Sequence, residues 1–155
     1  MRALVIAYGN PLRGDDGIAW RIADELRSIA PNNVRVLTVH QLAPELAEAV
    51  SEAEMVIFLD AAANGTPGNL HCTPALSQPE RIRFWHHITP QELLALSENL
   101  YARKPHSYLM TVYGERFEHG DVLSDAVADA IPRALALVNE LIRQGTQRAL
   151  DTVPA

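Results

Sequence analysis

Five acidic and imidazole side chains have the residue types and the placement to bind a divalent cation. Asp15 and Asp16 follow an apolar run near the N-terminus, Asp60 ends another apolar run, and His86 and His87 stand side by side before a third element. Carboxylate oxygens and neutral imidazole nitrogens form a borderline-hard donor set that suits nickel, zinc or manganese. The chemistry therefore depends on whether the fold brings these separate turns together.

The first of these turns lies within the stretch Ala3 to Ile18, around which the chain is organised. Five apolar residues run from Ala3 to Ala7 without alternation and lead to Gly9-Asn10-Pro11, which is typical of a doubly buried strand that meets a turn. From Ile18 onward apolar residues recur at helical spacing. A strand, a glycine-containing loop and a helix in this order open a doubly wound α/β domain.

The loop between this strand and this helix does not have the residues of a phosphate-binding loop. Gly9 and Gly14 have the spacing of a P-loop, but Asp15 and Asp16 stand where that motif has Lys and Ser or Thr. Two carboxylates at a helix N-terminus repel phosphate, so the loop suits a cation or an electron-poor group. The alternative role for such an acid is to cap the helix. With two adjacent acids, one can cap while the other faces a ligand.

The remaining pattern predicts alternating strands and helices. Strands are expected at 34–39, 55–59 and 107–113, with a short edge strand at 69–74, and a helix is expected to start at Pro44. Thr89-Pro90-Gln91-Glu92 is a capping box that begins a further helix. Ser124 is expected to cap the last helix, in which Pro132 predicts a kink or a division into two helices.

This order predicts one three-layer, doubly wound α/β domain over residues 1–150, followed by a frayed tail at 151–155. We expect a mainly parallel, twisted sheet of about five strands with helices on both faces. If the strand order begins 2-1-3, the winding reverses between the first and third strands. Asp16 and Asp60 then face each other across the crevice, with His40 after the second strand. The alternative for an Asp that ends a strand is a simple turn.

The third ligand of such a site is His86 or His87, in the segment before the capping box. The positive end of a helix dipole opposes protonation of a nearby imidazole, so either histidine is biased toward the neutral form that binds metals. The alternative is that both are ordinary surface residues.

The composition narrows the classes of partner. The 155 residues carry a net charge of −6, which disfavours nucleic acid and anionic membranes as partners. A single cysteine, Cys72, excludes an intramolecular disulfide and suits a reducing compartment. There is no apolar run of 18 residues and the first strand starts at the N-terminus, so we expect neither a signal peptide nor a membrane span. A cytoplasmic location is expected.

The segment Gly9-Asn10-Pro11-Leu12-Arg13-Gly14-Asp15-Asp16-Gly17 resembles the N-terminal motif of the hydrogenase maturation endopeptidases. These small proteases remove a C-terminal extension from the large subunit of nickel–iron hydrogenases. The family pattern is roughly Gly-Asn-x-Leu-x-x-Asp-(Asp/Glu)-Gly at the end of the first strand. The segment from His86 to Leu94 resembles a second family motif, which starts with a histidine, and the likeness extends from Arg2 to about Arg143.

The resemblance implies an endopeptidase whose substrate is a nickel-loaded hydrogenase large-subunit precursor. It implies that Asp16, Asp60 and His86 contact the nickel and form the catalytic group, with the nickel supplied by the substrate and no organic cofactor. Fixing the substrate through its metal suits a protease that has no paired nucleophile and base. Four further residues are expected to contact the substrate, with a turn or solvent exposure as their alternative role: Gly9, Asn10, Arg13 and His40.

One departure from the family pattern concerns the choice of hydrogenase. Many members have an Asp-Gly-Gly-Thr loop after the second strand, whereas this chain has the segment His40 to Leu46. This version resembles the subgroup that serves bidirectional, NAD-linked hydrogenases. We expect a monomer with a protein substrate. Two other functions remain open: a non-enzymatic nickel-binding assembly factor, and a doubly wound nucleotide or flavin binder.

Overall fold

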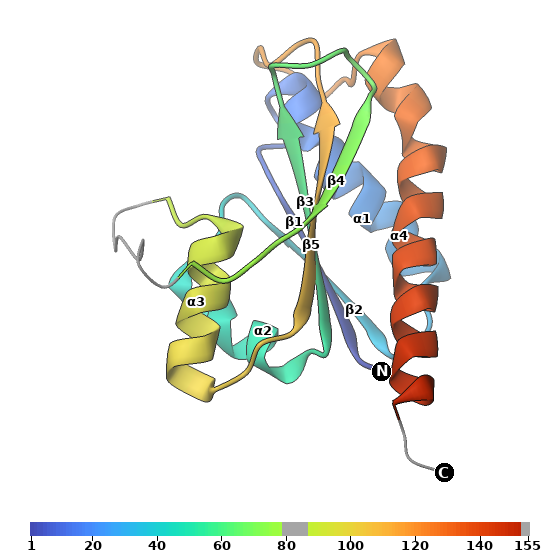
Figure 1. The fold of residues 1–155 in the computed structure, drawn as a ribbon. Helices are drawn as coiled ribbons and strands as arrows, with labels where there is room; N and C mark the ends of the chain where they lie inside the picture. The colour runs from blue at the N-terminus through green and yellow to red at the C-terminus, as the bar shows by residue number, and fades with distance from the viewer. Residues whose placement is uncertain (79–86, 153–155) are drawn as a thin grey trace.

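The computed structural model describes residues 1–78 and 87–152, in which a five-stranded sheet lies between two layers of helices (Figure 1). The strand order is β2-β1-β3-β5-β4, and only β4 is antiparallel to its neighbour. This confirms the predicted three-layer, doubly wound α/β fold and the 2-1-3 order. The strands are β1 (Ala3–Tyr8), β2 (Val34–Val39), β3 (Met55–Ala62), β4 (Leu70–Pro74) and β5 (His106–Tyr113). The helices are η1 (Gly14–Gly17), α1 (Ile18–Ile29), η2 (Pro44–Leu46), α2 (Ala47–Glu52), α3 (Pro90–Tyr101) and α4 (Asp125–Asp151), of which η1 and η2 are short 3-10 helices.

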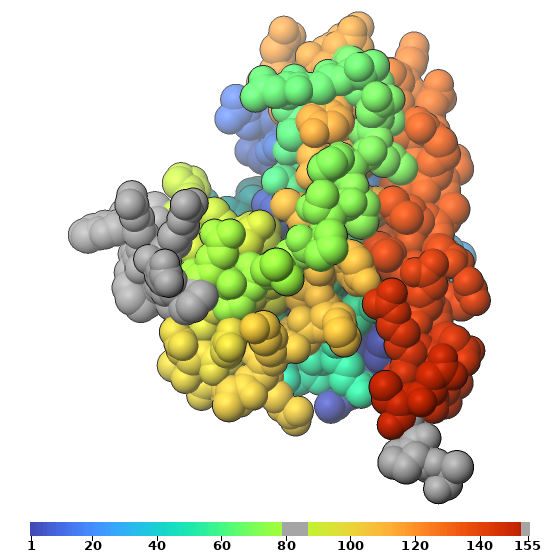
Figure 2. Space-filling model, in the orientation of Figure 1, coloured from blue at the N-terminus to red at the C-terminus, as the bar shows by residue number. Residues whose placement is uncertain are grey.

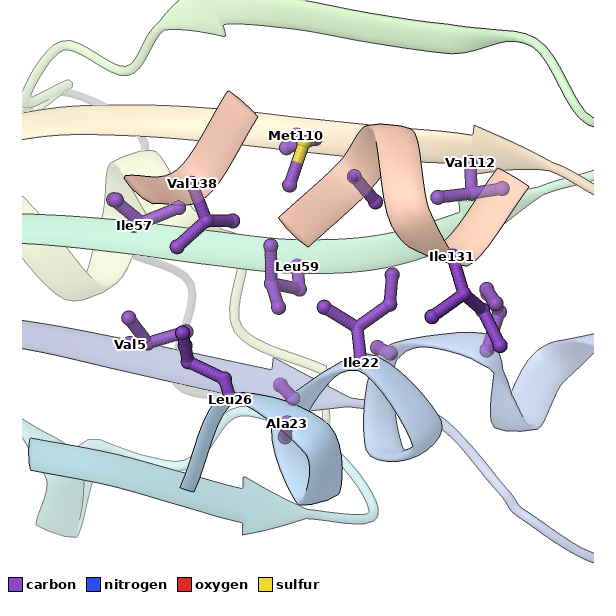
Figure 3. Close-up of a cluster of buried hydrophobic side chains, with 14 of the residues drawn as sticks. Val5, Ile22, Ala23, Leu26, Ile57, Leu59, Met110, Val112, Ile131 and Val138 are labelled. Atoms are coloured by element: carbon purple, nitrogen blue, oxygen red, sulfur yellow. The ribbon is translucent and has the colours of Figure 1, made fainter. Parts of the chain in front are cut away.

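The sheet is buried on both faces because the side chains of β1 alternate between two cores. Val5 packs into the core under α1 and α4, which also contains Leu26 and Val138 (Figure 3). Ile6 packs into the opposite core, under α2 and α3, with Phe58. Apolar residues on both faces of a strand produce a continuous apolar run, which is the pattern from which this strand was predicted.

β3 is longer than predicted, and β4 is the edge strand that was predicted. The third strand was expected to stop before Asp60, but β3 continues to Ala62 because its register with β5 extends to the pair Ala62 and Tyr113. Asp60 therefore lies within a strand. The edge strand is confirmed: the residues of β4 (green) lie on the surface of the face in Figure 2, between α3 and α4.

The capping box of α3 is confirmed by two reciprocal hydrogen bonds. The backbone amide of Glu92 donates to the Thr89 hydroxyl at 3.1 Å, and the Thr89 amide donates to the Glu92 carboxylate at 3.2 Å. These bonds fix the first turn of α3 directly after the segment that contains His86 and His87.

The last helix is a single element, so the predicted division into two helices is wrong. α4 passes through Pro132, which is exposed, while Ile131 and Ala134 keep the apolar face continuous. Proline has no N–H, so one carbonyl in the preceding turn loses its intrahelical hydrogen bond. Because Pro132 is exposed, this carbonyl lies near solvent, which reduces the free-energy cost of the missing bond. Of the predicted tail, Asp151 is the last residue of α4, and 153–155 are outside the described residues. In the described ranges no helix is long and apolar enough to cross a bilayer.

Candidate functional site

The carboxyl ends of β1 and β3 lie side by side at the topological switch point of the sheet. From β1 the chain crosses to β2 on one side, and it later continues to β3 on the other side. β1 lies between β2 and β3, and all three strands are parallel, so their following loops share one edge (Figure 1). Ligands of open α/β sheets bind at such a point. The loop that contains Asp16 and the end of β3 that contains Asp60 both lie there.

Asp16 is held in the turn after β1 by contacts with its own loop. Its Oδ2 accepts a hydrogen bond from the Asn10 amide at 2.7 Å. Gly9 has a φ of +140°, and a Cβ atom at this position would lie 2.2 Å from the Asp16 carbonyl oxygen. Only glycine allows this approach of the two backbone segments. The side chain of Asp16 stays partly exposed, so it remains accessible to a ligand.

Asp60 is a partly buried acid with a strongly altered pKa. Burial raises the pKa of Asp60 to about 6, against the lowering effect of hydrogen bonds from the Tyr8 side chain and the Ala61 amide; the negative charge of Asp16 raises it further. The Ala61 amide donates to Asp60 Oδ1 at 2.7 Å. The charge of Asp16 acts on Asp60, and the strand order places both acids at the same edge of the sheet; their joint binding of a ligand stays a prediction.

Tyr8 is a member of the site that sequence reasoning missed. Burial, the charge of Asp60 and the hydrogen bond to Asp60 all raise the pKa of the Tyr8 hydroxyl, which therefore stays protonated and donates to the carboxylate. The parallel register, in which Ala7 pairs with Leu59, places Tyr8 beside Asp60. In the sequence, Tyr8 ends one apolar run and Asp60 follows another, but only the alignment of β1 with β3 shows that the two residues are neighbours.

Asp15 does not cap the helix that follows it, so the capping role considered for this residue is wrong. η1 and α1 have no side-chain cap, and the fully buried Asp15 carboxylate instead accepts hydrogen bonds from Glu115, Arg116 and Ser124. Burial alone would raise the pKa of Asp15, but these hydrogen bonds outweigh it and lower the pKa. Ser124 occupies the predicted N-cap position of α4, but its hydroxyl donates a hydrogen bond to Asp15 and its side chain makes no capping hydrogen bond.

The residues expected to contact a substrate surround the same loop. The Asn10 side chain accepts a hydrogen bond from the Leu12 amide at 2.9 Å, which is the turn role considered as its alternative. Arg13 is exposed. His40 is exposed at the end of β2, where its ring packs edge-to-face against Trp20 with ring centroids 5.3 Å apart. A contact of these side chains with a substrate stays a prediction.

The predicted third ligand, His86, is outside the described residues. His87 is described and is exposed before α3. Within 1–78 and 87–152, no three His, Cys, Asp or Glu side chains are arranged to hold a metal ion. Of the three predicted metal ligands, the described part of the chain therefore contains only the carboxylates of Asp16 and Asp60. The role of His86 stays a prediction.

Several solved structures with this arrangement of strands and helices are hydrogenase maturation proteases. The hydrogenase maturating endopeptidase HybD from E. coli matches with a TM-score of 0.73 and 27% identity over 93% of both chains. A hydrogenase 2 maturation peptidase from a Thaumarchaeota archaeon matches with a TM-score of 0.70 and 27% identity, over 92% of this chain and 98% of that one. The [NiFe] hydrogenase maturation protease HycI from Thermococcus kodakarensis, at 16% identity and a TM-score of 0.74, shares the fold over 92% of both chains. No protein-family model and no curated protein matches the sequence.

Proposed function

We propose that this chain is an endopeptidase that removes the C-terminal extension of a nickel-loaded hydrogenase large-subunit precursor. The enzyme class rests on the comparisons: two solved structures at 27% identity, each matched over at least 92% of both chains, are hydrogenase maturation peptidases. They support a peptidase that works in hydrogenase maturation. The cleavage at the C-terminal extension and the recognition of nickel are our proposal.

The observation that supports nickel recognition is the approach of Asp16 and Asp60 at one edge of the sheet. One carboxylate comes from η1 and the other from the end of β3, and the charge of Asp16 raises the pKa of Asp60. Two adjacent carboxylates repel each other until a cation lies between them, so this pair favours binding of a divalent ion. Asp16, Asp60 and His86 together supply the oxygen and nitrogen donors that nickel accepts.

The nickel belongs to the substrate, so it acts as a recognition element of the precursor. Asp16 is oriented by the Asn10 amide, and Asp60 is oriented by Tyr8 and the Ala61 amide. Ligands that are already fixed can hold the nickel-bearing part of the precursor in one position, which in turn places the scissile peptide bond. Gly9 and Asn10 would line this position, and Arg13 and His40 would contact the substrate beside it.

The loop after β2 supports a finer assignment of the substrate. The segment His40 to Leu46 resembles that of the subgroup serving bidirectional, NAD-linked hydrogenases, and His40 lies at the same sheet edge as the carboxylate pair. We infer from this segment that the precursor belongs to such a hydrogenase. Action as a monomer in the cytoplasm is part of the same proposal and is consistent with the single cysteine.

The experiment that tests the function is mass spectrometry of the precursor after incubation with the purified protein. We expect the nickel-loaded precursor to lose its C-terminal extension and the nickel-free precursor to stay at full length. Binding of the nickel-loaded precursor without any loss of mass would contradict the peptidase and favour a nickel-binding assembly factor. Equal cleavage of both precursors would contradict nickel recognition.

A further inference from the structure

A second interaction network lies next to the carboxylate pair and is centred on Asp15, which the proposed function leaves without a role. Its side chain is 0% exposed. Its Oδ2 accepts hydrogen bonds from the amides of Glu115 and Arg116, at 2.7 and 2.9 Å, and from the Ser124 hydroxyl at 2.8 Å. Its Oδ1 accepts from the Ser124 amide at 2.7 Å. One buried carboxylate is thus bound by four donors from the segment between β5 and α4.

Backbone hydrogen bonds join the same two segments. The Asp15 amide donates to the Arg116 carbonyl at 2.7 Å, and the Gly14 amide donates to the Gly120 carbonyl at 2.8 Å. In return, the Gly120 amide donates to the Leu12 carbonyl at 2.7 Å. The loop after β1 is therefore attached to the segment 115–124 at several successive residues.

The two segments also pack so closely that there is no space for adjustment. A Cβ atom at Gly14, where φ is +56°, would lie 2.5 Å from the Arg116 carbonyl oxygen. A Cβ atom at Gly114 would lie 2.8 Å from the Asp15 Cβ. Glycine at these two positions lets the backbones pack in direct contact around Asp15, so the segment 114–124 encloses its side chain.

This attachment determines where Asp16 lies. Adjacent Cα atoms across a trans peptide are about 3.8 Å apart, so a shift of Asp15 moves Asp16 with it. Asp16 must in turn keep its Oδ2 at 2.7 Å from the Asn10 amide, at the sheet edge that Asp60 shares. Ligand groups function only when neighbouring residues hold them to within about 0.5 Å.

We propose that Asp15 is a positioning residue, whose anchorage to the segment 115–124 holds the Asp16 carboxylate in the orientation in which it accepts the hydrogen bond from the Asn10 amide. The inference rests on the proposed function for the role of Asp16. Its structural part can be tested without any substrate, because the Asn10 amide reports directly on the position of Asp16.

The test is hydrogen–deuterium exchange of the Asn10 amide in the full chain, followed by NMR. Asp15→Asn keeps the size of the side chain but replaces one acceptor oxygen by a donor that faces other donors. The control is Val138→Ala, which weakens the buried core under α4 without contacting the loop. We expect Asn10 exchange to accelerate about tenfold or more in Asp15→Asn and to stay within about twofold of the parent protein in Val138→Ala.

A second variant keeps the test decisive if Asp15→Asn does not fold. Ser124→Ala removes only the hydroxyl donor to Asp15, and we expect a measurable acceleration of Asn10 exchange in it. Unchanged Asn10 exchange in the folded variants, or an equal acceleration in Val138→Ala, would overturn the positioning role. Titration of Ni²⁺ into the parent protein and Asp16→Asn is a separate measurement: equal affinity there counts against the proposed function and leaves the Asn10 result standing.

Discussion

The Tyr8 side chain hydrogen-bonds to Asp60 across the boundary between β1 and β3, at the sheet edge where Asp16 also lies. The bond joins a partly buried phenol, which stays protonated, to an acid whose pKa burial raises to about 6. Tyr8 therefore favours the ionised form of Asp60, and burial together with the charge of Asp16 opposes it. The balance among these effects leads to the first two predictions.

Replacing Tyr8 by Phe should raise the pKa of Asp60 above its present value of about 6, because the hydrogen bond that favours the carboxylate is lost. The measurement is a pH titration of the Asp60 carboxyl carbon by NMR. Tyr108→Phe is the matched control, since Tyr108 lies on β5 and its hydroxyl contacts Arg148. An Asp60 pKa that stays the same or falls in Tyr8→Phe would show that Tyr8 does not support the carboxylate.

Replacing Asp60 by Asn should stabilise the protein at about pH 8 and leave its stability unchanged near pH 3.5. The pKa of Asp60 is raised in the folded state from 3.8 to about 6. Its contribution to stability is therefore fully present below 3.8 and is lost as the pH rises through about 6. A shift of this size corresponds to a gain of about 1–3 kcal/mol for the uncharged variant.

Urea unfolding at the two pH values measures this difference, with Asp125→Asn, at an exposed position, as the control. A variant that is less stable than the parent protein at about pH 8 would contradict the conclusion that burial destabilises the ionised form of Asp60.

Replacing Gly9 by Ala should destabilise the protein by about 2 kcal/mol or more and should displace Asp16. The new Cβ would lie 2.2 Å from the Asp16 carbonyl oxygen, in a backbone with φ of +140°. Gly120→Ala is the matched control, because Gly120 has a φ of +150° with nothing within 4 Å of its added Cβ. Both variants place alanine at a positive φ, but only Gly9→Ala also creates a clash, so the difference between their thermal unfolding temperatures measures the effect of the clash. Equal losses in the two variants would mean that the approach of Gly9 to Asp16 is unimportant.

Replacing Asp15 by Ala should cost about 3–5 kcal/mol at neutral pH, because four buried donors lose their acceptor. The pKa of Asp15 is lowered in the folded state from 3.8, so its contribution is present above that value and is lost as the pH falls through the folded-state pKa. Urea unfolding should therefore give a difference between parent and variant that narrows in strong acid. A difference below about 1 kcal/mol at neutral pH would contradict the network.

The sequence was sufficient to predict the fold and the placement of Asp16 and Asp60 at one edge of the sheet. Apolar runs without alternation identified β1 and β3, and the period change at Ile18 identified α1. These signals are local, so they can be recognised without knowledge of tertiary contacts. The end of β3 was misplaced because its last pairs depend on the register with β5, which no local pattern contains.

The roles of Asp15 and Tyr8 could not be predicted for the same physical reason. Asp15 sits at a position where helix capping is the common local use of an acid, and its actual donors lie at Glu115, Arg116 and Ser124, about a hundred residues along the chain. Tyr8 is an ordinary residue for the end of a strand, and its partner Asp60 can be identified only when β1 and β3 are aligned. Long-range hydrogen bonds, unlike periodicity, require the assembled fold.

The rate at which Asp16→Asn and Asp60→Asn shorten a nickel-loaded large-subunit precursor tests the central claim most directly. Each substitution keeps the shape of the side chain and removes one of the two negative charges that we propose face the nickel. Circular dichroism and thermal unfolding verify that the fold is retained. We predict that both variants leave the precursor at full length under conditions in which the parent protein removes its C-terminal extension completely. Cleavage by both variants at the rate of the parent protein would contradict the assignment of this carboxylate pair.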